Sequence, residues 1–152
     1  MERKLVRVFL DSNVILSGLL SSTGAPRSIL DILALSLPGI TGLTGRYNLI
    51  EIERNIRKKA PAIFPLYNEL LPKLHLDVVP LPSPAEVARL SGIIADKDTP
   101  VLASAIRGKA DFLVTGDKKH FEKARIPKSV PLKIMNPSEF LEELAVILSG
   151  TA

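Results

Sequence analysis

Runs of apolar residues alternate along this chain with segments in which apolar and polar residues recur at helical spacing. Residues 5–10 are almost continuously apolar, which predicts a strand buried on both faces of a parallel sheet. Helices are expected over 12–20, from Pro26 onward and over 47–59, because apolar side chains recur there every three or four residues. A short second strand is expected at 39–43, although its glycines weaken it.

The alternation continues through the rest of the chain. Pro61, Pro65 and Pro72 divide the next stretch into short helices. Ser83 and Glu86 have the spacing of a capping box, which predicts a helix from 84 to about 95. The remaining expected elements are strands at 75–79, 112–115 and 132–135, helices at 99–107 and 120–124, and a last helix capped by Ser138.

Alternating strands and helices predict an α/β fold with a central parallel sheet and right-handed crossovers. Helices then cover both faces of the sheet, giving three layers in the order α/β/α. The 152 residues are within the range of one domain, and the chain has no internal repeat. A single domain over 1–152 is therefore expected.

Three acidic residues follow or precede these elements at related positions. Asp11 comes directly after the first strand, Asp117 follows the strand at 112–115, and Asp98 stands where a helix begins. The carboxyl ends of parallel strands converge on one crevice, so these carboxylates are expected to meet. Like charges at short distance oppose ionisation, and a divalent cation removes that cost. Oxygen ligands of this kind suit Mg²⁺ or Mn²⁺.

Each acid also has an ordinary structural interpretation. Aspartate is a preferred N-cap, and Asp98 precedes Thr99 and Pro100 as a helix start would require. Asp11 is placed to cap the following helix, and Asp117 after Gly116 is typical of a turn. Taken singly the acids favour capping or turns, whereas together at one sheet edge they favour a metal site.

Composition and charge narrow the classes of protein. The chain has no cysteine, so disulfides are excluded and a reducing compartment, the cytoplasm, is expected. No stretch reaches the ~20 apolar residues needed to cross a bilayer, and polar residues interrupt the N-terminal apolar run, which argues against a secretory signal. No membrane association is expected.

The formal net charge is +4, which suits a polyanionic partner without requiring one. Basic residues gather on the helix at 47–59, including Arg54 and Lys58, and after Asp117, including Lys118 and Lys119. A basic run is often only a solvated face. Beside an acidic metal crevice, these four residues are candidates for contacts with nucleic-acid phosphates.

The ordered motifs resemble the PIN-domain family. They are Asp11-Ser-Asn13-Val-Ile, an acid on a mid-chain helix, Asp98-Thr-Pro-Val-Leu-Ala-Ser-Ala, and Leu113-Val-Thr-Gly-Asp117-Lys. The chain is most similar to proteins described as toxin components of toxin–antitoxin pairs, akin to VapC ribonucleases. The resemblance extends over roughly residues 5–140 and implies that Asp11, Asp98 and Asp117 bind metal together with a helical glutamate.

The resemblance assigns the helical glutamate to Glu51 rather than Glu53, because an aliphatic residue, Ile56, follows five positions later. It also implies that Asn13 and Thr115 orient the acids by hydrogen bonds. Asp96 is either a further acid beside the site or a solvated helix-end residue. Many relatives have another acid two residues after the strand-end aspartate, and this chain has Lys119 there.

The resemblance implies a Mg²⁺- or Mn²⁺-dependent endoribonuclease that hydrolyses RNA phosphodiester bonds. It also implies an antitoxin protein as partner and a homodimer. A PIN-like module that binds RNA or protein without cutting remains the alternative. Phosphatases of the haloacid-dehalogenase type fit less well, because they need a second aspartate where this chain has Asn13.

Overall fold

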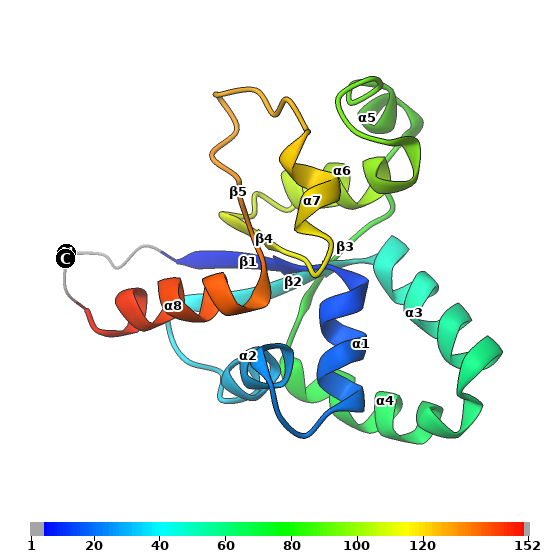
Figure 1. Cartoon of the computed structure of the whole chain (residues 1–152), viewed down its shortest axis with the longest axis vertical. Helices are drawn as coiled ribbons and strands as arrows, with labels where there is room; N and C mark the ends of the chain where they lie inside the picture. Colours follow the sequence, from blue (N-terminus) through cyan, green and yellow to red (C-terminus); the bar gives the residue numbers. More distant parts are fainter. Residues whose placement is uncertain (1–4, 151–152) are drawn as a thin grey trace.

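The computed structural model describes residues 5–150 and is built on one five-stranded sheet (Figure 1). Its strand order is β3-β2-β1-β4-β5, and every neighbouring pair is parallel. The expected parallel α/β fold is therefore confirmed. The strands are β1 (Val6–Leu10), β2 (Ile40–Gly45), β3 (Asp77–Val79), β4 (Phe112–Val114) and β5 (Lys133–Met135).

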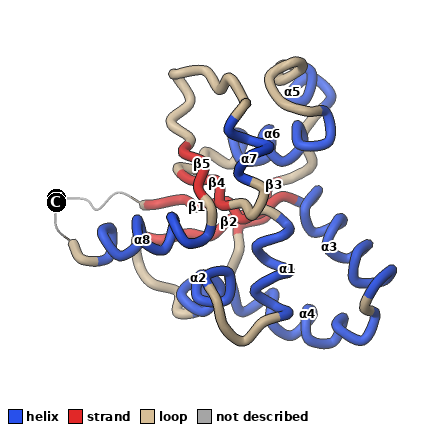
Figure 2. Tube along the Cα trace, in the orientation of Figure 1, coloured by secondary structure: helices blue, strands red, loops and turns tan. Residues whose placement is uncertain are grey.

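Helices surround this sheet, as the tube view in Figure 2 makes clear. In Figure 1, α1, α2, α4 and α8 lie below the sheet, α5, α6 and α7 lie above it, and α3 extends to the right. The α-helices are α1 (Ser12–Leu20), α2 (Ala25–Ala34), α3 (Arg46–Lys59), α4 (Phe64–Leu70), α5 (Pro84–Ala88), α6 (Thr99–Arg107), α7 (Lys118–Glu122) and α8 (Pro137–Leu148). Three 3₁₀ turns, η1 (Pro61–Ile63), η2 (Leu71–Leu74) and η3 (Asp96–Asp98), complete the order.

The core has two halves, one on each face of the sheet. Successive side chains of a strand point to opposite faces, so Val8 and Leu10 of β1 pack with α1, α2, α3 and α8, whereas Phe9 packs with α6 and α7. Phe112 and Leu113 of β4 divide in the same way. Because both faces are covered, β4 is apolar throughout and β1 is apolar except for Arg7, whereas the inner strand β2 also contains two threonines and two glycines.

Two predicted helix features were wrong. The helix expected to run from 84 to about 95 ends at Ala88, although its capping box between Ser83 and Glu86 is present. Turns follow, and Gly92 has φ +78, a conformation that cannot continue a helix. Leu90 and Ile94 are buried from these turns, so their apolar spacing reflects tertiary packing rather than a helix.

The last helix is capped by Asn136 and not by Ser138. The Asn136 side chain accepts a hydrogen bond from the Glu139 N–H at 2.8 Å, and the Glu139 carboxylate accepts one from the Asn136 N–H at 2.9 Å. Pro137 occupies the first helical position, which is where proline costs least. Ser138 therefore lies inside the first turn.

Other boundaries moved by a few residues. The second strand extends to Gly45, and β3 begins at Asp77 because His75 has a left-handed backbone conformation. The helix expected at 120–124 begins two residues earlier, at Lys118.

The helices in residues 5–150 include no candidate for a membrane-spanning segment, because none combines the required length with sufficient hydropathy.

The strand order reverses between β1 and β4. From the central strand β1 the chain adds β2 and β3 on one side, then β4 and β5 on the other. Leu10 is in register with Val114, so the residues that follow, Asp11 and Thr115, emerge side by side. Ligands of open α/β sheets bind at this kind of switch point.

Candidate functional site

Four carboxylates line one pocket of about 230 Å³ at this switch point. They are Asp11 after β1, Glu51 on α3, Asp98 at the end of η3 and Asp117 after β4. These four acids come from separate parts of the sequence, and the crossovers of the parallel sheet bring them together. We call this cavity the acid pocket.

Asp11 is the most firmly held of the four acids. Its side chain is buried and accepts hydrogen bonds from the Ser12 N–H at 2.8 Å, the Thr115 hydroxyl at 2.8 Å and the Asn48 amide nitrogen at 3.1 Å. Asn48 also donates to the Ser12 hydroxyl at 2.9 Å. Donors from α1, α3 and the residue after β4 therefore fix the orientation of both Asp11 oxygens.

Burial also changes the acidity of Asp11. The pKa of Asp11 is raised from 3.8 to about 6, mainly by desolvation and to a smaller extent by the neighbouring carboxylates of Glu51 and Asp117. The hydrogen bonds from Thr115 and Ser12 oppose this by stabilising the ionised form. The acid pocket thus holds a buried carboxylate close to other negative charges.

Asp117 is exposed and is oriented by Asn13. The Asn13 amide nitrogen donates to an Asp117 oxygen at 3.0 Å, while its amide oxygen accepts from the Gly116 N–H at 2.9 Å. A Cβ at position 116 would lie 3.3 Å from the Asn13 oxygen, so glycine permits this close approach. The hydrogen bonds expected of Asn13 and Thr115 are thus present.

Glu51 and Asp98, on the other side of the acid pocket, lack such support. Across residues 5–150, no hydrogen bond reaches either carboxylate, and one Asp98 oxygen is buried without a hydrogen-bond partner. The nearby His120 Nδ1 is 3.8 Å from that oxygen. Burial raises the pKa of the Tyr47 hydroxyl, and Glu51, Asp98 and Asp11 add to this, which is consistent with a shared negative field.

Capping does not explain these acids as a group. Asp11 is the N-cap residue of α1 and its side chain bonds the Ser12 N–H. Asp98 and Asp117 occupy the residues before α6 and α7, but neither side chain caps its helix. Two of the three acids are therefore free of the structural duty that aspartate usually has at these positions.

The acid pocket has the donors that a hard cation prefers, without forming a complete cage. Within residues 5–150, no three His, Asp or Glu side chains lie close enough together to surround one ion. Mg²⁺ commonly keeps several waters and uses only one or two protein carboxylates, so a closed cage is not required. The unpartnered buried oxygen of Asp98 and the crowded charge around Asp11 fit such an ion.

A family model for the PIN domain matches residues 7–119, about three quarters of the chain. The chain is a member of the PIN domain family. No match was found among curated proteins. The matched region contains all four acids of the acid pocket.

Solved structures share the fold of this PIN domain. A chain of VapBC2 from Rickettsia felis, crystallised with a DNA fragment from the promoter, aligns with a TM-score of 0.64 at 19% identity, covering 86% of this chain and 98% of the other. PAE2754 from Pyrobaculum aerophilum aligns with a TM-score of 0.64 at 15% identity, covering 93% and 98%. At these identities the likeness concerns the fold.

The two glutamates of α3 have different surroundings in this PIN domain. Glu51 lines the acid pocket, whereas Glu53 accepts a hydrogen bond from the buried Tyr67 hydroxyl at 3.0 Å. Asp96 is exposed and lies outside the lining of the acid pocket, where Lys97 is found instead. The geometry therefore brings Glu51 to the other acids and leaves Asp96 apart.

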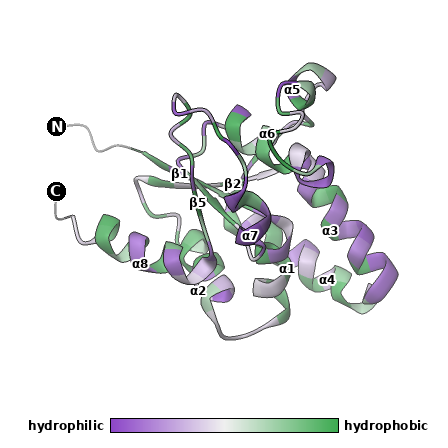
Figure 3. Cartoon of the chain, turned by 45° about the horizontal axis from the view of Figure 1, so that its top comes forward, coloured by the Kyte–Doolittle hydropathy of each residue, from purple (hydrophilic) through white to green (hydrophobic). Residues whose placement is uncertain are grey.

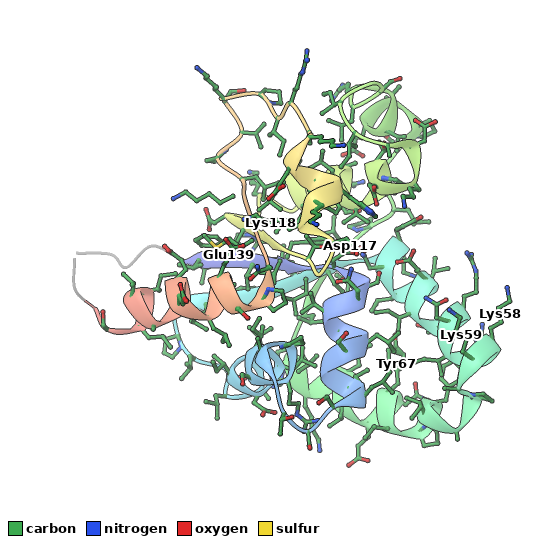
Figure 4. All side chains as sticks on the ribbon, in the orientation of Figure 1. Lys58, Lys59, Tyr67, Asp117, Lys118 and Glu139 are labelled. Atoms are coloured by element: carbon green, nitrogen blue, oxygen red, sulfur yellow. The ribbon has the colours of Figure 1, made fainter. Side chains whose placement is uncertain are left out.

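The four basic candidates also separate. Lys118 donates to both carboxylate oxygens of Glu139 on α8 at 2.9 Å, an arrangement that can be followed in Figure 4. Lys119 is exposed and lines grooves next to the acid pocket. Arg54 and Lys58 lie on the outer face of α3, which Figure 3 shows as hydrophilic.

Sequence patterns missed two residues of the acid pocket and its surroundings. Asn48 is fully buried and bonds Asp11, and it precedes Glu51 by three residues on the same helix. A buried asparagine at this spacing from an expected site glutamate was the available signal, since residues three apart share a helix face. Lys97 stands between two aspartates and gave no signal of its own.

Proposed function

We propose that this PIN domain protein is a Mg²⁺- or Mn²⁺-dependent endoribonuclease that hydrolyses RNA phosphodiester bonds. The observation that supports it most is the convergence of Asp11, Glu51, Asp98 and Asp117 on one pocket at the switch point of the sheet. Membership of the PIN domain family supports the same class of activity.

The acid pocket would hold the ion, with one or two of its four carboxylates as direct ligands and the others bound through water. When bound, such an ion stabilises the charge of a phosphoryl group and makes water more acidic. Asn48 and Thr115 hold Asp11, and Asn13 holds Asp117, so these two acids keep their orientation when substrate arrives. Glu51 and Asp98 are free to turn toward the ion or an attacking water.

Hydrolysis by water suits this site better than attack by a side chain. Ser12 is the hydroxyl residue that lines the acid pocket, and its oxygen accepts from the Asn48 amide nitrogen while its O–H donates to the Asn48 carbonyl at 3.4 Å. No base is in hydrogen-bond contact with that hydroxyl in the described part of the chain. A serine held in this way is a structural element rather than an activated nucleophile.

The direct test is cleavage of a labelled single-stranded RNA by the purified protein, with Mg²⁺, with Mn²⁺ and with excess EDTA. We expect cleavage with either ion and none with EDTA. Asp117→Asn should abolish most of the cleavage, while Asp31→Asn, an exposed acid paired with Arg27 on α2, should leave it unchanged. Cleavage that survives EDTA would exclude the proposed metal chemistry.

We also propose that the protein is the toxin of a toxin–antitoxin pair, because it shares its fold with a chain of VapBC2. Co-expression with the product of a short neighbouring reading frame should then give a stable complex that suppresses cleavage.

A homodimer is expected and is tested by light scattering. A cytoplasmic location stays a prediction.

The second candidate is a PIN domain that binds RNA without cutting it. Two observations favour it: Lys119 stands where many relatives have an acid, and no three acids surround one point. Binding of RNA with no cleavage under any divalent ion would favour this function.

A further inference from the structure

A second groove adjoins the acid pocket between the start of α6 and α7. It has a volume of about 380 Å³ and is lined by Lys97, Lys119, His120 and Lys123, with Ile93 and Ile94 as apolar lining. We call it the α6–α7 groove. Its lysines come from η3, α7 and the residue after α7.

The α6–α7 groove is continuous with the acid pocket, because Lys97 and Asp98 line both. The charge changes sign between them. The acid pocket has four carboxylates and one lysine, whereas the groove has three lysines and a histidine beside the single shared carboxylate. A polyanion whose reacting phosphate lay at a cation in the acid pocket would therefore meet positive charge next to it.

The three lysines of the groove are free to bind a ligand. Lys97, Lys119 and Lys123 are exposed, and none of them forms an ion pair with another described residue. Lys118 differs from them, because Glu139 holds its ammonium group. Lys118 and Lys119 are neighbours in the sequence, but only Lys119 is available to bind a ligand, because Lys118 is paired with Glu139.

The lining of the groove also indicates how a nucleic acid would be held. It contains no Phe, Tyr or Trp, since Phe121 of α7 is buried in the core, and its one aromatic ring is the imidazole of His120. Bases therefore have only this small ring to stack on, whereas phosphates have three ammonium groups. Contacts of this kind hold the backbone and carry little sequence information.

Positive charge also lies on α3, the helix that contributes Glu51 to the acid pocket. Arg54, Arg57 and Lys58 line a groove on α3, whose residues Glu51 and Asn55 line the acid pocket. In Figure 4, Lys58 and Lys59 project from the far end of α3, away from Asp117. The basic surface of α3 thus extends away from the acid pocket, whereas the α6–α7 groove shares Lys97 with it.

We propose that the α6–α7 groove binds the backbone of single-stranded RNA next to the scissile phosphate, through Lys97, Lys119 and Lys123 and without base preference. This inference rests on the proposed ribonuclease function, since that function supplies the strand. Lys97, which lines both cavities, is then the residue closest to the phosphate at the junction.

Fluorescence anisotropy with a labelled oligouridine, in EDTA so that nothing is cleaved, tests the groove separately from catalysis. The variant Lys97→Ala/Lys119→Ala/Lys123→Ala should bind about sixty-fold more weakly at 0.15 M salt, from about fourfold per lost contact. The slope of log K against log salt should fall by about 2, at about 0.7 per phosphate contact on a single strand.

Lys133→Ala, which removes an exposed lysine of β5, is the matched control and should change neither quantity. Equal melting temperatures of wild type and triple variant establish that the fold is intact, and Lys123→Ala alone should give about a fourfold loss. Unchanged affinity and slope in a folded triple variant would overturn the proposal.

Two further results keep this proposal apart from the proposed function. Oligouridine, oligoadenosine and oligocytidine should bind with affinities within about fivefold, whereas stacking on a base would separate them more widely and contradict backbone binding. If wild type binds RNA through the groove but cuts nothing with Mg²⁺ or Mn²⁺, the groove stands and the ribonuclease function fails. If wild type cuts RNA and the triple variant binds and cuts equally well, the ribonuclease function stands and the groove proposal fails.

Discussion

The two sides of the acid pocket differ in how their carboxylates are held. On the fixed side, Asp11 and Asp117 accept hydrogen bonds from Ser12, Thr115, Asn48 and Asn13. On the free side, Glu51 and Asp98 have no hydrogen bond from any residue in 5–150, and one Asp98 oxygen is buried without a partner.

This difference follows from where each side comes from. The fixed side lies at the ends of two paired strands, where backbone and neighbouring side chains are already in register. The free side comes from α3 and the loop before α6, which approach the site as separate elements. A preorganised side and an adaptable side suit a site that must accept both an ion and a changing substrate.

The largest expected effect is on cleavage by Asp11→Asn. If the fixed side supplies the main ligand, this change should lower the rate at least about 10³-fold, and Glu51→Gln should lower it less. Single-turnover cleavage with saturating Mn²⁺ measures both. A greater loss in Glu51→Gln than in Asp11→Asn would reverse the assignment of the two sides.

The pH dependence of stability should also report on the fixed side. Because burial raises the pKa of Asp11 to about 6, its neutral form stabilises the folded state. This stability is present below about pH 4 and is lost as the pH rises past 6, which amounts to up to about 3 kcal/mol in metal-free protein.

Asp11→Asn cannot lose a proton, so its free energy of unfolding relative to wild type should rise between pH 4 and 7. Urea titrations in EDTA across this pH range measure the free energy of unfolding of both proteins. Groups that titrate equally in the two proteins cancel when one value is subtracted from the other. A constant difference would mean that Asp11 is not titrating as its surroundings indicate.

Metal should stabilise the wild type through both sides. At a Mg²⁺ or Mn²⁺ concentration 100 times Kd, the free energy of unfolding should rise by about 2.7 kcal/mol. Asp98→Asn should blunt this response and be more stable than wild type without metal, because one crowded charge is gone. A normal metal response and normal cleavage in this variant would make Asp98 a plain helix-start residue.

Removing a hydrogen bond on the fixed side should have a smaller effect than removing an acid. Thr115→Val takes away the hydroxyl that donates to Asp11, and Asn48→Ala takes away a second donor. Each should lower metal affinity or cleavage about 10- to 100-fold. Thr115→Ser keeps the hydroxyl and should stay near wild type in metal affinity and cleavage. Equal losses in the Val and Ser variants would mean that packing of the Thr115 methyl group, and not its hydrogen bond to Asp11, is responsible.

The smallest effect is expected at Lys118. Its ammonium group is held by Glu139 on a partly exposed surface, where ion pairs contribute little. Lys118→Ala should lower the melting temperature slightly and leave RNA affinity unchanged. A loss of RNA affinity equal to that of Lys119→Ala would show that Lys118 leaves Glu139 to bind phosphate.

Much of the fold could be predicted from local patterns. Strand β1, which is apolar except for Arg7, and helix α6, with its apolar residues at helical spacing, are both predicted from their own sequences. The helix expected to 95 failed because Leu90 and Ile94 are buried from turns, and burial alone imitates helical spacing. The last helix began at Asn136 because a cap depends on the reciprocal bonds with Glu139.

For the acid pocket, the sequence by itself determined which acids could meet. Asp11 and Asp117 follow parallel strands, and such strands end at one edge of a sheet whatever packs around them. The choice of Glu51 over Glu53 came from the family resemblance. In the tertiary structure Glu51 lines the acid pocket, whereas Glu53 accepts a hydrogen bond from the Tyr67 hydroxyl.

Only the tertiary structure decided which side chains are held and which are free. Asn48 reaches Asp11 because α3 packs against α1, and Glu139 reaches Lys118 because α8 returns to the edge of the sheet beside β5. Lys97 joins the acid pocket to the α6–α7 groove for the same kind of reason. The sequence determines which side chains are acidic, basic or amide. Which of them form hydrogen bonds or ion pairs across long distances in the chain depends on how the helices and strands pack.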